Sequence, residues 1–294
     1  MNKLPLAKRI QILSMLCEGS SMRSVSRVAD VSINTVTKIL EDAGEICAAF
    51  HDKMVRGLAS KRVQVDEIWS FVYAKDKNVK GAEAAPQGAG DAWTWTALDA
   101  DSKLLVSFFV GDRSGHCAEW FMDDVASRLL SRVQLTSDGH KAYLDAVEGA
   151  FGGDVDFAQL VKIYGADPYG VKGRYSPAEC IGIKKMPITG APDERHVSTS
   201  YVERSNLTMR MSMRRFTRLT NGFSKKLENH VHMIAIYTVL YNWLRIHKTL
   251  RTTPAMAAGL TDKLIGWEEI IALMDAAEQP KKRGPYNKRV DAVE

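Results

Sequence analysis

Three acidic residues occupy positions in the sequence where a carboxylate could do chemistry. Asp66 lies within the strand-like run 63–69, where a charge among apolar neighbours is costly unless it is paired or bound to metal. Asp138 follows the short apolar run 133–136 and precedes a helical segment, and ligands of α/β sheets commonly bind at such strand ends. Glu203 begins a segment with helical spacing. The three acids could therefore meet at one edge of a sheet.

Carboxylates that meet in this way suit phosphodiester cleavage by two metal ions. Such sites hold two Mg²⁺ ions roughly 4 Å apart, one near the attacking oxygen and one near the leaving oxygen. We predict that Asp66, Asp138 and Glu203 are the catalytic, metal-binding residues. Helical spacing places Asn206 and Arg210 on the face of Glu203, at i+3 and i+7. The predicted contacts to DNA phosphates from this region are Arg204, Asn206, Arg210 and Arg214.

Each acid also has a plainer interpretation. Asp66 could be exposed near a strand end, Asp138 could form an Asx turn, and Glu203 could simply favour a helix start. The order and the placement of all three together favour the catalytic interpretation. The neighbouring Glu67 should point to the sheet face opposite Asp66, because side chains alternate along a strand. We therefore expect Glu67 to lie away from the site.

The first 45 residues predict a helix-turn-helix domain. Apolar spacing indicates helices over 6–18, 22–29 and 33–42, with Ser21 and Ser32 able to cap the second and the third. The outer face of the third helix carries small polar residues and one lysine, which suits contact with base edges. A plain helical hairpin is the alternative. The predicted DNA-contacting residues are Asn34, Thr35, Thr37 and Lys38.

The remaining chain is predicted to contain an α/β catalytic core. After a connector over 46–60, the order β-β-β-α-β-α-β-α over 61–250 is that of an RNase H-like mixed sheet covered by helices. Residues 165–200 are expected to form an irregular insertion, and 201–218 and 225–248 long helices. A helical segment over 251–279, with a helix at 267–277, and a basic, disordered tail over 280–294 complete the expected organisation.

Charge and composition agree with a partner that is a polyanion. Residues 1–62 carry ten Lys/Arg against six Asp/Glu, residues 91–160 five against twelve, and residues 204–294 sixteen against eight. Basic ends can neutralise phosphates, while clustered carboxylates need a cation. The four cysteines are far apart and are expected to be reduced thiols, without a zinc site. No apolar run is long enough for a membrane span, and we expect a cytoplasmic protein.

Three blocks of the sequence carry a resemblance to a known family. The runs Asp66-Glu67-Ile68-Trp69, Ser137 to Tyr143 and Tyr201 to Leu207 resemble the catalytic blocks of bacterial insertion-sequence transposases, most closely the insertion-sequence-one family. The run from His247 to Leu260 resembles the segment that closes many such domains. Many relatives carry a zinc-binding cysteine cluster before the helix-turn-helix, and this chain has none there.

The resemblance extends from about residue 5 to about residue 260. It implies a DDE transposase that uses two Mg²⁺ or Mn²⁺ ions, binds the terminal inverted repeats of its element on double-stranded DNA, and acts as a homo-oligomer near the bacterial nucleoid. Two alternatives stay open. One is a non-catalytic DNA-binding regulator derived from a transposase, and the other is an RNase H-like nuclease, because active-site residues alone do not separate hydrolysis from strand transfer.

Overall fold

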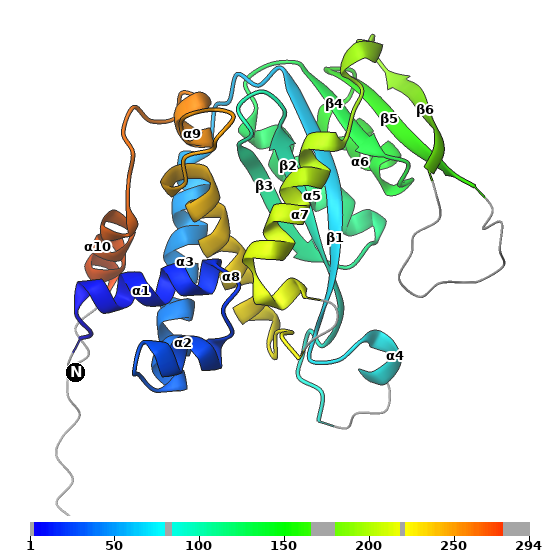
Figure 1. Cartoon of the computed structure of the whole chain (residues 1–294). Helices are drawn as coiled ribbons and strands as arrows, with labels where there is room; N and C mark the ends of the chain where they lie inside the picture. Colours follow the sequence, from blue (N-terminus) through cyan, green and yellow to red (C-terminus); the bar gives the residue numbers. More distant parts are fainter. Residues whose placement is uncertain (1–2, 80–83, 166–179, 218–220, 279–294) are drawn as a thin grey trace, which may run out of the picture.

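The chain forms a mixed α/β structure around a six-stranded sheet (Figure 1). The computed structural model describes residues 3–79, 84–165, 180–217 and 221–278. The strand order is β3-β2-β1-β4-β5-β6; β4 is parallel to β1 and to β5, and the other pairs are antiparallel. The strands are β1 (Arg62–Val72), β2 (Gly90–Asp99), β3 (Leu105–Gly111), β4 (Val133–Asp138), β5 (Val155–Tyr164) and β6 (Cys180–Thr189).

Helices cover both faces of this sheet. Helix α7 (Ser200–Ser212) crosses β1 and β2 on one face, and α5 (Gly115–Arg128) and α6 (Ala142–Phe151) pack together on the other (Figure 1). The fully buried rings of Trp95, Phe121 and Tyr143 join β2 to these two helices, with Trp95 5.9 Å from Phe121 and 5.5 Å from Tyr143 between ring centroids. Apolar burial on this scale is the main source of stability in such a sheet.

One segment expected to be irregular contains a strand. Residues 180–189 form β6, which pairs with β5 at the edge of the sheet, and a 3₁₀ turn, η1 (Glu194–His196), follows before α7. Most residues of β6 are exposed or half-buried, so its pattern lacks the apolar alternation by which half-buried strands are recognised. A strand that is held mainly by backbone pairing at an edge leaves little trace in the sequence.

The N-terminal helices are α1 (Leu6–Cys17), α2 (Met22–Val28) and α3 (Ile33–Met54). Both expected caps are present, because the Ser21 hydroxyl accepts from the Ser24 backbone N–H and the Ser32 hydroxyl accepts from the Thr35 backbone N–H, each at 3.1 Å. Val28 lies at apolar spacing from the buried Val25, yet it is 59% exposed. It is the last residue of a short helix that ends in a tight turn.

The expected boundary near residue 45 falls inside a continuous helix. Helix α3 runs for 22 residues, so the segment 46–54, for which a helical connector was expected, continues the same helix and packs with other helices. Its partner is α8 (Leu227–Val239), which continues as the π-helical turn η3 (Leu240–Leu244). At their crossing, a Cβ added to Gly44 would lie 2.2 Å from the Cβ of His232. The glycine therefore permits the close approach of the two helices.

Replacing Gly44 by alanine is expected to destabilise the protein. Alanine favours a helix over glycine by about 1 kcal/mol, but overpacking a tight contact costs roughly 1–3 kcal/mol, and here backbone as well as side chain must move. We expect a net loss of about 1–2 kcal/mol in urea unfolding. The control is Gly149→Ala in α6, where a Cβ meets nothing within 4 Å, so stability should rise. A stabilising Gly44→Ala would contradict this packing.

The last helices complete the shell around α1 and α3. Helix α10 (Trp267–Ala277) spans the expected range and packs on α1 and α3, with Trp267, Ile270 and Ile271 buried. The short elements are α4 (Asp76–Val79), η2 (Arg214–Phe216) and α9 (Pro254–Ala257). Over the described part of the chain, no helix is long and apolar enough to cross a membrane. The basic tail expected at 280–294 lies outside the described residues.

Candidate functional site

An acidic edge forms where β1 and β4 separate. The two strands pair only from Arg62 to Gln64 on β1, so the residues of β1 that follow are not paired with β4. There, one carboxylate oxygen each of Asp66, Glu67 and Asp138 lie within 4.8 Å of one another. We call these three residues the acidic edge. Its position at the carboxyl end of β4 is the one at which open α/β sheets usually bind ligands.

Asp66 is held in place from α7. The amide nitrogen of Asn206 donates to Asp66 Oδ2 at 2.8 Å, and the Asn206 carbonyl oxygen accepts from the Thr96 hydroxyl at 2.9 Å. Burial raises the pKa of Asp66 to about 6; the bond from Asn206 lowers it, and the charge of Asp138 raises it further. A carboxylate in this setting is stabilised in its charged form by a cation.

Glu67 belongs to the site, contrary to the expectation from strand alternation. Its side chain does turn toward the opposite face of the sheet, where Arg113 Nη2 donates to Glu67 Oε2 at 3.0 Å. However, β1 no longer pairs with β4 here, and one Glu67 carboxylate oxygen lies within 4.8 Å of an oxygen of Asp66 and of Asp138. The side chain is only 1% exposed, and no described residue makes a hydrogen bond of normal geometry to its Oε1. Burial raises the pKa of Glu67 to about 7, although the nearby Tyr143 hydroxyl lowers it.

Asp138 ends β4, as its sequence context predicted. Its Oδ1 accepts from the backbone N–H of His140 at 2.9 Å, which fixes the turn into the following helix. Its Oδ2 lies 3.8 Å from Arg113 Nη2, so one guanidinium faces two acids of the edge. Arg113 itself lies over the ring of Trp93, 4.7 Å from the ring centroid. This arginine partly offsets the negative charge of the acidic edge.

Glu203 lies near the acidic edge but outside the group of three. Its Oε1 accepts from Lys162 Nζ and from the Thr199 hydroxyl, each at 2.5 Å. Asp66 nevertheless experiences the charge of Glu203, which raises the pKa of Asp66 slightly. The structure thus brings Asp66 and Asp138 together as predicted, adds Glu67, and leaves Glu203 paired with a lysine of β5.

The acidic edge has the donor set of a divalent metal site. Mg²⁺ and Mn²⁺ prefer carboxylate oxygens, and three such oxygens within 4.8 Å repel one another unless a cation lies between them. The residues present therefore fit a metal ion.

The residues predicted to contact DNA from α7 are separated from one another. Asn206 is 5% exposed and both its amide atoms are bonded within the protein, so it positions Asp66 instead of facing outward. Arg204 is exposed on a different face of the helix, and Arg210 is half-buried. The helix ends at Ser212, earlier than expected, and Arg214 lies beyond it in η2, off the stripe of Glu203.

The predicted DNA-contacting face of α3 lies beside α10. Asn34 and Lys38 are exposed, and Thr35 and Thr37 are half-buried; Thr37 donates to the Ile33 carbonyl, as helical threonines commonly do. Lys38 Nζ donates to Asp42 Oδ1 at 2.8 Å. A cavity of about 510 Å³ separates this face from Asp275 and Glu278 at the end of α10. These acidic neighbours are far from α3 in the sequence, so local spacing does not predict them.

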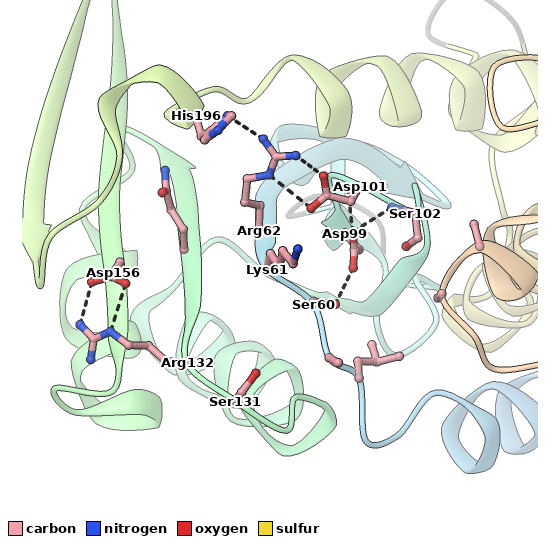
Figure 2. Close-up of a pocket in the computed structure, with 15 residues that line it drawn as sticks. Ser60, Lys61, Arg62, Asp99, Asp101, Ser102, Ser131, Arg132, Asp156 and His196 are labelled. Atoms are coloured by element: carbon pink, nitrogen blue, oxygen red, sulfur yellow. Dashed lines mark hydrogen bonds and ion pairs between the residues drawn. The ribbon is translucent and has the colours of Figure 1, made fainter.

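A larger hollow of about 1030 Å³ lies at the other end of the sheet and holds no residue of the acidic edge (Figure 2). Its charges are largely paired within the protein. Arg62 bonds both Asp101 and His196, and Arg132 Nη2 bonds Asp156 Oδ1 at 2.7 Å (Figure 2). A hollow whose charges are neutralised in this way offers little to a charged ligand.

The fold and the acidic edge describe a mixed α/β protein with a candidate metal site at a strand end. No protein-family model matches the chain, and no curated protein matches its sequence. Among solved structures, the chain is similar to one in "Cryo-EM structure of piggyBac transposase synaptic complex with hairpin DNA", with a TM-score of 0.39 and 9% sequence identity. That match covers 96% of this chain and 76% of the other.

Proposed function

We propose that this protein is a DNA transposase with an RNase H-like core that cleaves and rejoins DNA strands at the acidic edge. The observation that supports this most directly is the convergence of Asp66, Glu67 and Asp138. Carboxylate clusters at strand ends suit Mg²⁺ or Mn²⁺, and these ions, when bound in pairs, activate an attacking oxygen and stabilise a leaving one.

The residues around the edge have distinct tasks in this proposal. Asp66 and Asp138 hold the metal ions, and Asn206 keeps Asp66 in one orientation through its hydrogen bond. Glu203, the third predicted ligand, must exchange its bond with Lys162 for metal. Without metal, Lys162 pairs with Glu203 and Arg113 lies near Asp138. In the proposed complex, these two cations contact DNA phosphates next to the acidic edge.

DNA recognition is assigned to the N-terminal helices. We propose that α2 and α3 form a helix-turn-helix and that the outer face of α3 contacts the terminal inverted repeats of the element. The cap at Ser32 supports this, because it fixes the start of α3 directly after the turn that follows α2. The proposed contacts to bases are Asn34, Thr35, Thr37 and Lys38. Arg204, Arg210 and Arg214 are proposed to contact phosphates, and the protein is proposed to act as a homo-oligomer on double-stranded DNA.

The test is a strand-transfer assay with a labelled duplex that carries the end of the element, identified from inverted repeats that flank the gene. With Mg²⁺, the protein should expose a 3′-hydroxyl and join it to a second duplex, because both steps are in-line attacks by an oxygen on phosphorus. Ca²⁺ should permit binding with little chemistry. Efficient cleavage without any joined product would replace this proposal with a nuclease, and binding without cleavage would replace it with a regulator.

A further inference from the structure

A third cavity lies beside α7, on the side of the helix away from the acidic edge. It has a volume of about 410 Å³ and is formed by α7, by the turn between β2 and β3, and by the segment after η3. Tyr201, Arg204 and Thr208 line it from α7, at the i, i+3 and i+7 positions of one stripe. Glu203 and Asn206, which face the site, lie on roughly the opposite side of the helix, because successive residues of an α-helix are turned by about 100°. Helix α7 therefore contributes residues both to this cavity and to the surroundings of the acidic edge.

The charged residues that line this cavity are all basic. Lys103, Arg204, Arg245 and Lys248 line it together with His247, and no Asp or Glu is among the described residues that line it. We call it the cationic pocket. Lys103 lies over the ring of Tyr201. Within the described part of the chain, the side chains of Arg204, Arg245 and Lys248 form no ion pair. Several like charges around one cavity repel one another until an anion enters.

The arrangement differs from that of the large hollow in Figure 2. There, Arg62 and Arg132 each have a carboxylate partner among the lining residues. Three exposed cations without such partners in one small cavity instead leave their hydrogen-bond donors available for an external anion. Arg204 offers a guanidinium, whose fork of donors matches phosphate oxygens, and Lys248 offers an ammonium group.

We propose that the cationic pocket binds consecutive phosphate groups of a DNA strand that passes over α7 to the acidic edge. This inference rests on the proposed function for the identity of its ligand. An α-helix with its side chains is about 10–12 Å across, so a strand needs only a few nucleotides to reach from one side to the other. The pocket fixes the strand that flanks the reacting phosphate, and it does so without reading bases.

The experiment compares two double variants of the full chain. Arg204→Ala/Lys248→Ala removes two charges from the cationic pocket, and Lys53→Ala/Lys263→Ala removes two exposed charges elsewhere. Affinity for a labelled 30-base-pair duplex is measured by fluorescence anisotropy between 50 and 200 mM KCl, in EDTA. Loss of two phosphate contacts should reduce the slope of log K against log salt by about 1.8 and the affinity at 100 mM by about 60-fold. The control variant should match the wild type.

The outcomes separate the pocket from the proposed function. If the wild-type protein cleaves DNA but both double variants show the same salt slope, the cationic pocket does not bind DNA phosphates. The proposed function would then still stand. Wild-type protein that binds no DNA would overturn both. Titration calorimetry with pyrophosphate tests whether the ligand is a free anion. The inference would be wrong if the Arg204→Ala/Lys248→Ala variant loses micromolar binding of pyrophosphate but keeps the wild-type salt slope for DNA. Arg245→Gln provides an independent check, with an expected slope change of about 0.9.

Discussion

Asp66→Asn and Asp138→Asn are each expected to reduce metal-dependent DNA cleavage by about 10³-fold or more. Each change removes one negative ligand charge and almost no volume, and a loss of about 4 kcal/mol in stabilisation of the transition state corresponds to a thousandfold in rate. Folding should be unaffected, since Asp66 is a buried carboxylate whose pKa burial already raises to about 6. Single-turnover cleavage of a labelled duplex on a denaturing gel measures the effect.

The matched control for these variants is Asp154→Asn, because the Asp154 side chain is 79% exposed and does not belong to the acidic edge. This variant should cleave at the wild-type rate. DNA affinity, measured without divalent metal, should be unchanged or slightly higher in all three variants, because each removes a negative charge. If Asp66→Asn or Asp138→Asn cleaves DNA at the wild-type rate, the substituted residue does not bind metal.

Glu67→Gln is expected to impair cleavage as well, although strand alternation alone predicts that it does nothing. Its carboxylate lies in the group with Asp66 and Asp138, and its Arg113 contact helps to fix the charges that face Asp138. Ligands and the groups that orient them typically affect metal affinity by about 10- to 100-fold. The Mg²⁺ concentration for half-maximal cleavage should therefore rise by about that factor.

Comparison with Glu203→Gln distinguishes two descriptions of the site. If Glu67→Gln needs a higher Mg²⁺ concentration for half-maximal cleavage, Glu67 is among the groups that bind the ion. If Glu67→Gln is indistinguishable from the wild type while Glu203→Gln is inactive, the predicted set of Asp66, Asp138 and Glu203 is the complete one. Glu67 would then serve only as the partner of Arg113, and Glu203 would have to leave Lys162 when metal binds.

Much of the central sheet could be predicted because its strands are buried. The runs at β1, β4 and β5 carry apolar residues with strand spacing, and the β2–β3 hairpin has a turn in which Asp99 Oδ1 accepts from the backbone N–H groups of Asp101 and Ser102. Strand β6 was missed because most of its side chains are exposed or half-buried and its pairing is made by backbone atoms, which every sequence supplies.

The site was only partly predictable for a different reason. Asp66 and Asp138 could be identified because each lies in a distinctive local pattern, in a strand or at the end of one. The role of Glu67 depends on how far β1 and β4 diverge, which is a property of two segments about 70 residues apart. Likewise, the pairing of Glu203 with Lys162 and the acids of α10 beside α3 are long-range contacts that no local spacing encodes.

The continuous helix α3 would act as a ruler in the proposed function. Its 22 residues span about 33 Å, with the proposed DNA contacts at one end and the tight Gly44 crossing with α8 near the middle. No flexible tether then lets the recognised sequence drift relative to the reacting phosphate. The distance and the helical phase between the two should be fixed, so one extra base pair between them, which turns the duplex by roughly a tenth of a rotation, should move the phosphate out of reach.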